Sequence, residues 1–329
     1  EKSVRSIDVP RAIDWIRQQI SITLAEKQEL AVRQALLEKI LIITGGPGTG
    51  KTTIINAIIK ILKKAGAKIL LAAPTGRAAK RMNETTWEPA KTIHRMLDYS
   101  IKEGGFKKNS SSPLKCDVLI IDEASMIDTI LMHHLLKAVP SSCTLILVGD
   151  INQLPSVGAG NVLSDLIRSD AFSVVTLDTI FRQAQKSLIV VNAHKINNGD
   201  FPILANESRK SNFYFIQKEE PETVLSTIVD LVRNRIPNRF GYDAVNDIQV
   251  LTPMHRGVVG AGNMNIELQQ TLNPGTAGLK RGNREFRPSD KVMQIRNNYD
   301  KHVYNGDIGR ITDINETDGT VLIDFDGRP

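Results

Sequence analysis

The sequence predicts an α/β protein in which helices cover both faces of a parallel β-sheet, followed by a smaller β-rich part. Short apolar runs alternate with amphipathic segments through the first half of the chain, and this alternation is typical of parallel strands joined by helices. A chain of 329 residues is too long for one ordinary core, so two or three domains are expected. From about residue 286, short β-rich runs separated by turn residues favour a small barrel or hairpin module.

Composition and charge exclude some classes of protein. Hydrophobic residues make up 41% and charged residues 24%, as in soluble globular proteins, and no apolar run approaches the roughly 18 residues of a membrane span. The N-terminus has no apolar segment of a signal peptide. The net charge of +6 suits a polyanionic partner without proving one. Cys116 and Cys143 are expected to be reduced, buried thiols rather than zinc ligands, which favours a cytoplasmic protein.

The predicted elements follow from hydrophobic periodicity and breakers. In the first half the expected elements are a strand at 40–44, a helix at 52–65 that ends at Gly66, and strands at 68–73, 118–122 and 144–150. A second block begins near Val174, with a strand at 174–177, helices at 187–197 and 222–235, and a strand at 248–252. The expected β-runs of the tail are 291–296, 309–314 and 320–325. The predicted boundaries are a helical lead-in at 1–23, a first α/β domain at 24–173, a second at 174–285 and the β-rich part at 286–329.

One polar stretch, 99–115, interrupts the first α/β domain. It contains Gly-Gly and a serine run between a predicted helix and a predicted strand. It is either a flexible surface loop or a β-hairpin that projects from the domain, and the sequence leaves both open.

The clearest motif is GGPGTGKT at residues 45–52, which matches G-x-x-x-x-G-K-[ST] between a predicted strand and a predicted helix. Glycines let the backbone curl so that its N–H groups face phosphates, and the helix N-terminus adds its dipole. Lys51 is expected to reach the β- and γ-phosphates, and Thr52 to bind Mg²⁺. The pattern alone can occur by chance, but its position between strand and helix predicts a P-loop NTPase fold. The residues expected to hold ATP are Gly46, Pro47, Gly48, Thr49, Gly50, Lys51, Thr52 and Thr53.

Acidic and amide side chains follow two other predicted strands of this sheet. Asp122 and Glu123 end the strand VLIID, where Asp122 would hold Mg²⁺ and Glu123 would orient and deprotonate an attacking water. The alternative for this pair is a solvated turn. Gln153 follows the strand at 144–150 and could touch both the γ-phosphate and the water. These residues predict an ATP hydrolase.

The motifs together resemble the RecD-like group of superfamily 1B helicases, closest to the stand-alone bacterial members. The segments that carry the resemblance are GGPGTGKTT, APTGRAAKRM, TIHRML, LIIDEASMID, LVGDINQLPSVGAG, FRQ, VLTPMHRG and VYNGDIG, in that order from residue 45 to residue 309. The resemblance covers nearly the whole chain from about residue 24. It implies that both α/β domains are RecA-like motor domains, that 99–115 is a pin hairpin at the duplex fork, and that the β-rich tail is an SH3-like insertion.

The resemblance also implies roles for individual residues. Gln28 matches an adenine-reading glutamine, and Arg182 matches an arginine finger directed at the γ-phosphate. A solvated helix face is the alternative for Arg77 and its basic neighbours. The residues implied to contact single-stranded DNA are Pro74, Thr75, Arg77, Thr92, His94 and Arg95 in the first motor domain and His255 and Arg256 in the second.

The function implied is an ATP-dependent, monomeric motor that moves 5′ to 3′ on single-stranded DNA and unwinds duplex during repair or recombination, with protein partners possible at the SH3-like module. The family pattern continues with segments resembling HKSQGSEF and YTAITRA (motifs V and VI), which the 329 residues do not contain. The chain alone is therefore expected to bind Mg-ATP or ADP near normally, to show little DNA-stimulated hydrolysis and not to unwind duplex. The alternatives are a fragment that binds ATP and DNA without unwinding, and a translocase on RNA or mixed substrates.

Overall fold

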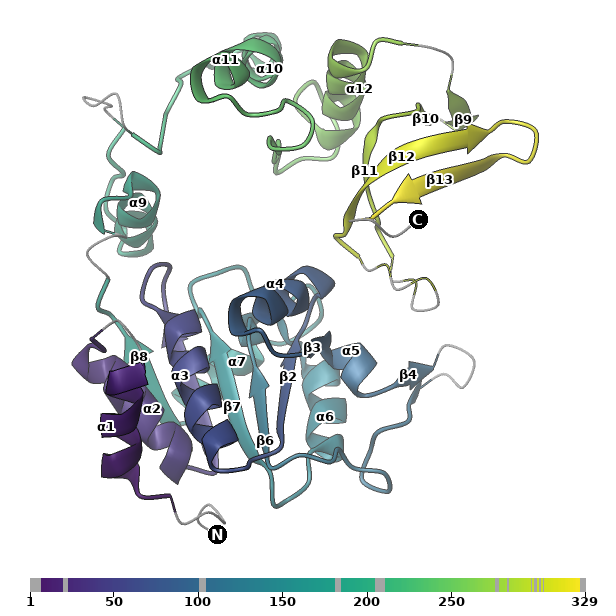
Figure 1. The fold of residues 1–329 in the computed structure, drawn as a ribbon. Helices are drawn as coiled ribbons and strands as arrows, with labels where there is room; N and C mark the ends of the chain where they lie inside the picture. The colour runs from purple at the N-terminus through teal and green to yellow at the C-terminus, as the bar shows by residue number, and fades with distance from the viewer. Residues whose placement is uncertain are drawn as a thin grey trace. The chain divides into compact units, whose positions relative to one another are not determined.

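The computed structural model describes residues 7–19, 23–100, 105–180, 185–204, 211–275, 278–282, 284–296, 298, 301, 303 and 305–325. The chain divides into two compact units, Glu1–Tyr214 and Phe215–Pro329 (Figure 1). Within the described residues, no helix has both the length and the apolar character needed to cross a membrane.

The first unit is built on a six-stranded sheet in which all neighbouring strands are parallel, in the order β3-β2-β6-β7-β1-β8. Its strands are β1 (Ile40–Gly45), β2 (Ile69–Ala73), β3 (Ala90–Thr92), β6 (Val118–Ile121), β7 (Thr144–Gly149) and β8 (Ser173–Leu177). Every residue of β6 and β7 is buried, because these central strands are covered on both faces. The predicted parallel α/β fold is therefore confirmed.

Helices cover the two faces of this sheet. The helices of the first unit are α1 (Val9–Gln19), α2 (Glu26–Leu37), α3 (Lys51–Lys64), α4 (Gly76–Thr86), α5 (Ile93–Met96), α6 (Thr129–Ala138), α7 (Val162–Arg168), α9 (Leu188–Asn197) and the 3₁₀ turn η1 (Ala124–Met126). Leu41 and Ile43 of β1 pack into one core cluster with α1, α2 and α3, whereas Ile42 packs into a second cluster with α5, α6 and α7. This alternation is the two-residue period of a strand buried on both sides.

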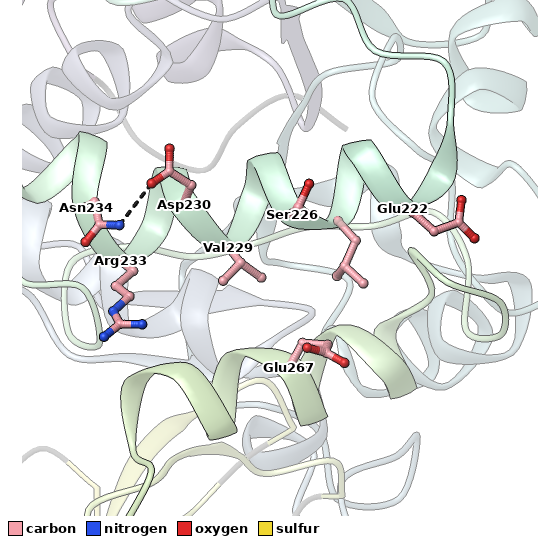
Figure 2. A pocket seen from close by; sticks show the side chains of 8 residues that line it. Glu222, Ser226, Val229, Asp230, Arg233, Asn234 and Glu267 are labelled. Atoms are coloured by element: carbon pink, nitrogen blue, oxygen red, sulfur yellow. Dashed lines mark hydrogen bonds between the residues drawn. The ribbon is translucent and has the colours of Figure 1, made fainter.

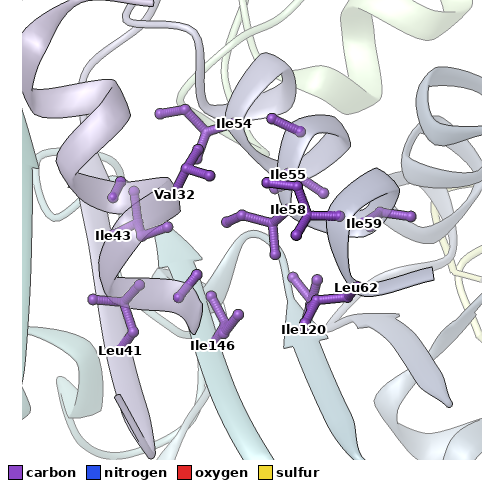
Figure 3. Packing of buried hydrophobic residues seen from close by; sticks show 14 of the residues in the cluster. Val32, Leu41, Ile43, Ile54, Ile55, Ile58, Ile59, Leu62, Ile120 and Ile146 are labelled. Atoms are coloured by element: carbon purple, nitrogen blue, oxygen red, sulfur yellow. The ribbon is translucent and has the colours of Figure 1, made fainter. Parts of the chain in front are cut away.

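The α3 face shows how the core positions the motif at the strand ends. Ile54, Ile55 and Ile58 are almost completely buried against Leu41 and Ile43 (Figure 3). Burial of such a side chain contributes about 1.5–3 kcal/mol relative to exposure. The apolar face of α3 therefore holds the helix against the sheet, with its N-terminus at the carboxyl end of β1.

One strand differs from the predicted domain organisation. The strand predicted at 174–177 was placed at the start of the second motor domain, but as β8 it pairs with β1 at the edge of the first sheet, with Ile43 opposite Val175 and Thr44 opposite Thr176. The apolar pattern predicted a strand correctly but contained no information about its partner, because pairing is decided by contacts between distant segments.

The polar insertion begins as a hairpin. β4 (Tyr99–Ser100) pairs antiparallel with β5 (Gly105–Phe106), with Tyr99 opposite Phe106, and Asn109 and Ser112 then form an isolated bridge. The hairpin interpretation is therefore correct for the described part of 99–115, and residues 101–104 lie outside the described residues.

The second unit contains helices followed by small antiparallel sheets. Its elements are α10 (Pro221–Asp230), the π-turn η2 (Leu231–Arg235), α11 (Ile236–Phe240), α12 (Ala261–Leu272), β9 (Leu279–Arg281), β10 (Arg284–Phe286), β11 (Lys291–Met293), β12 (Ile308–Asn315) and β13 (Thr320–Asp324). The π-turn precedes Pro237, which lacks the N–H that a regular helix would use at that position. β9 pairs with β10, and β11, β12 and β13 form a three-stranded sheet, so the predicted β-rich tail is confirmed.

The strand predicted at 248–252 is wrong, because these residues have no regular secondary structure. Leu251 is 88% exposed, so this apolar run has no sheet to complete within the described residues of its unit.

A hollow of about 360 Å³ lies between α10 and α12, lined by Glu222, Asp230, Arg233 and Glu267 among others (Figure 2). It contains none of the residues predicted to bind nucleotide or DNA.

Candidate nucleotide and nucleic-acid site

The predicted P-loop connects β1 to α3. β1 ends at Gly45 and α3 begins at Lys51, so the intervening loop lies at the carboxyl end of a central strand of the sheet. Gly48 and Gly50 have φ of +76° and +84°, the left-handed region that glycine enters without strain. The predicted phosphate-binding geometry of strand, glycine turn and helix N-terminus is therefore present.

Side chains hold the carbonyl groups of this loop. The Lys51 Nζ donates to the carbonyl oxygens of Gly45 at 2.6 Å and Gly46 at 3.2 Å, and the Thr49 hydroxyl donates to Gly46 at 2.8 Å. The buried Gln28 donates from Nε2 to the carbonyl of Thr49 at 2.8 Å and accepts the N–H of Ala25 at its Oε1. Gln28 thus lies against the P-loop, with its amide engaged by the backbone.

Asp122 and Glu123 follow β6, two strands away from β1. The Asp122 N–H donates to the carbonyl of Ala72 on β2, and the Asp122 Oδ1 accepts the N–H of Glu123 at 2.9 Å. Glu123 adopts a left-handed conformation with φ of +54°, which turns the chain sharply after the strand. Both residues therefore lie directly at the end of β6, and the Asp122 carboxylate is bonded to the backbone there.

Burial and neighbouring charges shift the pKa values of both carboxyls. Burial raises the pKa of Asp122, and the Glu123 N–H and the charges of Lys51 and Arg81 offset part of that rise. Burial also raises the pKa of Glu123, followed by the negative charge of Asp122, again with Lys51 and Arg81 acting in the opposite direction. The charge of Lys51 thus acts on both carboxyls, although β7 separates β6 from β1 in the sheet.

The side-chain oxygen atoms of Thr52 and Asp122 are ligands of the kind that suits Mg²⁺. Thr52 on the first turn of α3 carries a hydroxyl and Asp122 a carboxylate, and magnesium in nucleotide sites is held by one or two such oxygen ligands together with phosphates. The charges of Lys51 and Arg81 offset only part of the rise in the Asp122 pKa, and a bound Mg²⁺ would compensate the carboxylate further. Among the residues described, no group of three or more His, Cys, Asp or Glu could hold a metal by itself.

Gln153 lies beyond β7 in a turn organised by Asp150. The Asp150 side chain is 2% exposed and accepts the N–H of Asn152 at 3.0 Å and the Nε2 of Gln153 at 3.3 Å. The charge of Asp150 also raises the pKa of Glu123, so this turn and the acidic pair are close enough to interact.

Arg182, the predicted arginine finger, lies outside the described residues.

Two segments predicted to contact DNA are brought together by strand pairing. β2 and β3 are adjacent and parallel, with Ala73 opposite Thr92. Thr92 is the last residue of β3 and Thr75 lies two residues beyond the end of β2, so both threonines lie at the same edge of the sheet. Each threonine caps a helix: the Thr75 hydroxyl accepts the N–H of Ala78, and the Thr92 hydroxyl accepts the N–H of Arg95. Each hydroxyl still has a hydrogen to donate. Arg77 and Arg95 are exposed, and Pro74 is half-buried beside them.

His94 has a different environment from its neighbours. Its ring centroid lies 6.0 Å from that of Tyr99 and 5.6 Å from that of Phe106, so it packs against the base of the hairpin. Burial lowers the pKa of His94.

In the second unit, His255 and Arg256 are exposed in the loop before α12, where the carbonyl of His255 accepts the N–H of Gly262.

The sequence interpretation did not identify one residue at the P-loop. His194 on α9 lies with its Nε2 3.1 Å from the carbonyl oxygen of Pro47. No motif contains His194, and its contact with the P-loop follows from the tertiary structure; Gly46, the residue next to the ring, occupies a position that the P-loop pattern leaves free.

Comparisons with known proteins place both units in one family. A family profile described as an AAA domain matches residues 28–159, and one described as the SH3 domain of ATP-dependent RecD-like DNA helicases matches residues 264–325. The second match begins within α12, before the predicted start of the β-rich part at residue 286.

Curated relatives agree with these profiles. The chain is 35% identical over 305 residues to the ATP-dependent RecD2 DNA helicase of Deinococcus radiodurans, which covers 93% of this chain and 40% of that protein. It is 32% identical over 323 residues to the RecBCD enzyme subunit RecD of Mycobacterium tuberculosis, covering 86% of this chain and 55% of that subunit. The chain thus spans about half the length of these relatives.

Among solved structures, a Bacteroides Pif1 bound to single-stranded DNA matches with 17% identity and a TM-score of 0.47, covering 94% of this chain and 73% of that one. The family assignment rests on the sequence relatives and the two profiles. The P-loop between β1 and α3 and the acidic pair after β6 agree with it. The chain belongs to the RecD-like family of superfamily 1 ATP-dependent DNA helicases.

Proposed function

We propose that the chain is the motor of a helicase that hydrolyses ATP, moves 5′ to 3′ along single-stranded DNA and separates duplex during repair or recombination. The observation that carries this proposal is the placement of three groups at the carboxyl ends of parallel strands of one sheet. Lys51 begins the helix that follows β1, and Asp122 and Glu123 follow β6, where the charge of Lys51 acts on both carboxyls. The polarity and the pathway rest on the family resemblance alone.

For hydrolysis, we assign each group a role that its position permits. The N–H groups of Gly46, Gly48, Thr49 and Gly50 and the Lys51 ammonium would hold the β- and γ-phosphates. Thr52 and Asp122 would hold Mg²⁺, which neutralises developing phosphate charge when bound. Glu123 would accept a proton from the attacking water, and its raised pKa makes it a better base than an exposed glutamate.

The remaining nucleotide contacts complete the proposal. Gln153 would orient the attacking water from the turn after β7. Arg182 would bring positive charge to the γ-phosphate, a contribution that raises hydrolysis rates by about 10³–10⁵-fold in related chemistry. Gln28 would read adenine, which requires its amide to exchange at least one of its present partners.

For DNA, we propose a path over the ends of β2 and β3. Pro74, Thr75, Thr92, His94 and the exposed Arg77 and Arg95 lie on two segments that strand pairing brings together. Phosphate and sugar contacts of this kind tolerate any base order, as a translocating motor requires. His255 and Arg256 would contribute contacts from the second unit.

The test is ATP hydrolysis by a protein that also carries the family's HKSQGSEF-like and YTAITRA-like segments, measured with no nucleic acid, with oligo-dT and with oligo-U of equal length. Stimulation by oligo-dT above oligo-U is expected. Lys51→Ala removes a charge from the transferring phosphoryl group while the loop backbone remains, and is expected to lower the rate by about 10²–10³-fold. Equal rates for the wild type and Lys51→Ala would refute the nucleotide site, and stimulation by oligo-U alone would favour an RNA translocase.

A further inference from the structure

Four carbonyl groups of the P-loop accept hydrogen bonds from side chains, and two of these side chains, Gln28 and His194, come from outside the motif. Gly45 and Gly46 are held by Lys51, and Thr49 by Gln28. The fourth, Pro47, faces the Nε2 of His194 at 3.1 Å. A carbonyl oxygen can only accept, so His194 Nε2 must carry the hydrogen of this bond.

This bond has a consequence for phosphate binding. A trans peptide is planar, and its C=O and the following N–H point in opposite directions. Because His194 holds the Pro47 carbonyl on one side of the peptide plane, the N–H of Gly48 points to the other side. Gly48 has φ of +76°, which belongs to the curled part of the loop. His194 therefore orients an N–H that can face a bound phosphate.

Gly46 provides a second, independent observation. A Cβ built on Gly46 would lie 2.7 Å from Cε1 and 3.3 Å from Nε2 of His194, closer than atoms can approach without a shift. Gly46 does not have the positive φ of Gly48 and Gly50, so its backbone does not require glycine. The P-loop pattern does not require glycine at this position either. The imidazole ring thus occupies the space that a side chain at residue 46 would need.

The helix that carries His194 is fixed by its own contacts. The side chain of Asn192 is 1% exposed and exchanges two hydrogen bonds with Ile203, accepting its N–H at 2.7 Å and donating to its carbonyl at 3.0 Å. Ser187 accepts the N–H of Val190 at the N-terminus of α9 and is itself bonded by Asn212 at 2.8 Å. These hydrogen bonds hold α9 in place, so His194 contacts the P-loop from a helix that has its own stabilising contacts.

We infer that His194 is a positioning residue for the phosphates of the bound nucleotide, acting through the Pro47 carbonyl to orient the Gly48 N–H. This inference rests on the proposed nucleotide site. α9 follows β8, the edge strand of the sheet, and shares no motif with the P-loop. The contact therefore couples phosphate affinity to the position of a helix outside the first sheet.

The experiment measures the Kd of ADP and AMP for the wild type and for His194→Ala. Loss of one hydrogen bond, worth about 1 kcal/mol, is expected to weaken ADP binding about fivefold. AMP, which lacks the β-phosphate, should be affected less. His194→Gln retains a donor and should restore most of the ADP affinity, whereas Asn197→Ala, an exposed change on the same helix, should bind ADP like the wild type.

A double-mutant cycle with Gly46→Ala separates positioning from a general effect on folding. Alone, Gly46→Ala should displace the imidazole and weaken ADP binding as His194→Ala does. In the His194→Ala background the ring atoms nearest to the added methyl are absent, so the double variant should bind ADP no more weakly than either single variant. Additive losses would overturn the inference.

The outcomes also distinguish this inference from the proposed function. If wild type and Lys51→Ala bind ADP equally, the nucleotide site itself is wrong and the inference falls with it. If Lys51→Ala loses ADP binding while His194→Ala binds ADP like the wild type, only the role of His194 is refuted. Equal weakening of ADP and AMP by His194→Ala, without restoration by His194→Gln, would also refute it.

Discussion

The Gln28 side chain donates from Nε2 to the carbonyl oxygen of Thr49 at 2.8 Å, which ties the first turn of α2 to the P-loop. Gln28 is 1% exposed, and its Oε1 accepts the N–H of Ala25 at 3.0 Å. In this arrangement the residue supports the loop, and the adenine-reading role implied by the family would require the amide to leave one of these partners.

Gln28→Ala should therefore affect both stability and nucleotide binding. The change leaves the Thr49 carbonyl and the Ala25 N–H without their partner in a buried place, at a cost of about 1–3 kcal/mol in the free energy of unfolding. Urea denaturation measures this cost, and Kd values for ADP and GDP measure the rest. Similar weakening of both nucleotides is expected from a loop-supporting role, whereas a loss confined to ADP would show that adenine reading dominates.

Glu123→Gln should separate nucleotide binding from hydrolysis. The amide keeps the shape of the side chain but cannot accept a proton from water, and general-base catalysis contributes about 10²–10⁴-fold to rates of this kind. Turnover should fall by that factor while the affinity for a non-hydrolysable ATP analogue stays within about twofold of wild type. Loss of analogue binding would instead make Glu123 a structural residue or a direct metal ligand.

Asp122→Asn should stabilise the nucleotide-free chain near neutral pH. The pKa of Asp122 is raised in the folded state, so its contribution to stability is most favourable below the unfolded pKa and is lost as pH rises through the folded pKa. At pH 7 the wild type therefore carries a buried charge that the variant lacks. The variant should have the higher Tm in EDTA at pH 7, and the difference should shrink as the pH is lowered toward 4.

Magnesium provides the control for this prediction. Mg²⁺ with ADP should raise the Tm of the wild type, because the cation compensates the Asp122 carboxylate, and should raise that of Asp122→Asn much less. Equal shifts in the two proteins would remove Asp122 from the proposed metal site, and equal pH dependence in EDTA would contradict the buried-charge explanation.

Arg77→Ala and Arg95→Ala should each weaken single-stranded DNA binding in a salt-dependent way. Each exposed arginine is proposed to contact one phosphate, so each change should reduce the slope of log K against log salt by about 0.7. Fluorescence anisotropy with oligo-dT and with a mixed-sequence strand at several salt concentrations measures this slope. Lys60→Ala, an exposed change on α3, serves as the charge control. A strong preference for one base order would argue against a translocase path.

Local chemistry explains why much of this site could be predicted. The P-loop depends on glycines at Gly48 and Gly50, whose left-handed backbone is a property of the residue itself, and on Lys51 at the start of a helix. Asp122 and Glu123 follow a short, continuous apolar run of the kind that favours a strand buried on both faces. By contrast, the partner of β8, the coil at 248–252 and the contacts of His94 depend on segments far away in the chain.

The sequence by itself determined the parallel α/β class, the β-rich tail, the P-loop and the residue types at the strand ends, because strand and helix periods and glycine conformations are local. Only the tertiary structure decided which residues meet. It brings Cys116 and Cys143, 27 positions apart, to 3.4 Å between their sulfur atoms as buried free thiols, and it brings His194 to Pro47, 147 positions away. Such contacts follow from the order of strands and the packing of helices, which arise from the burial of many side chains together and from no single motif.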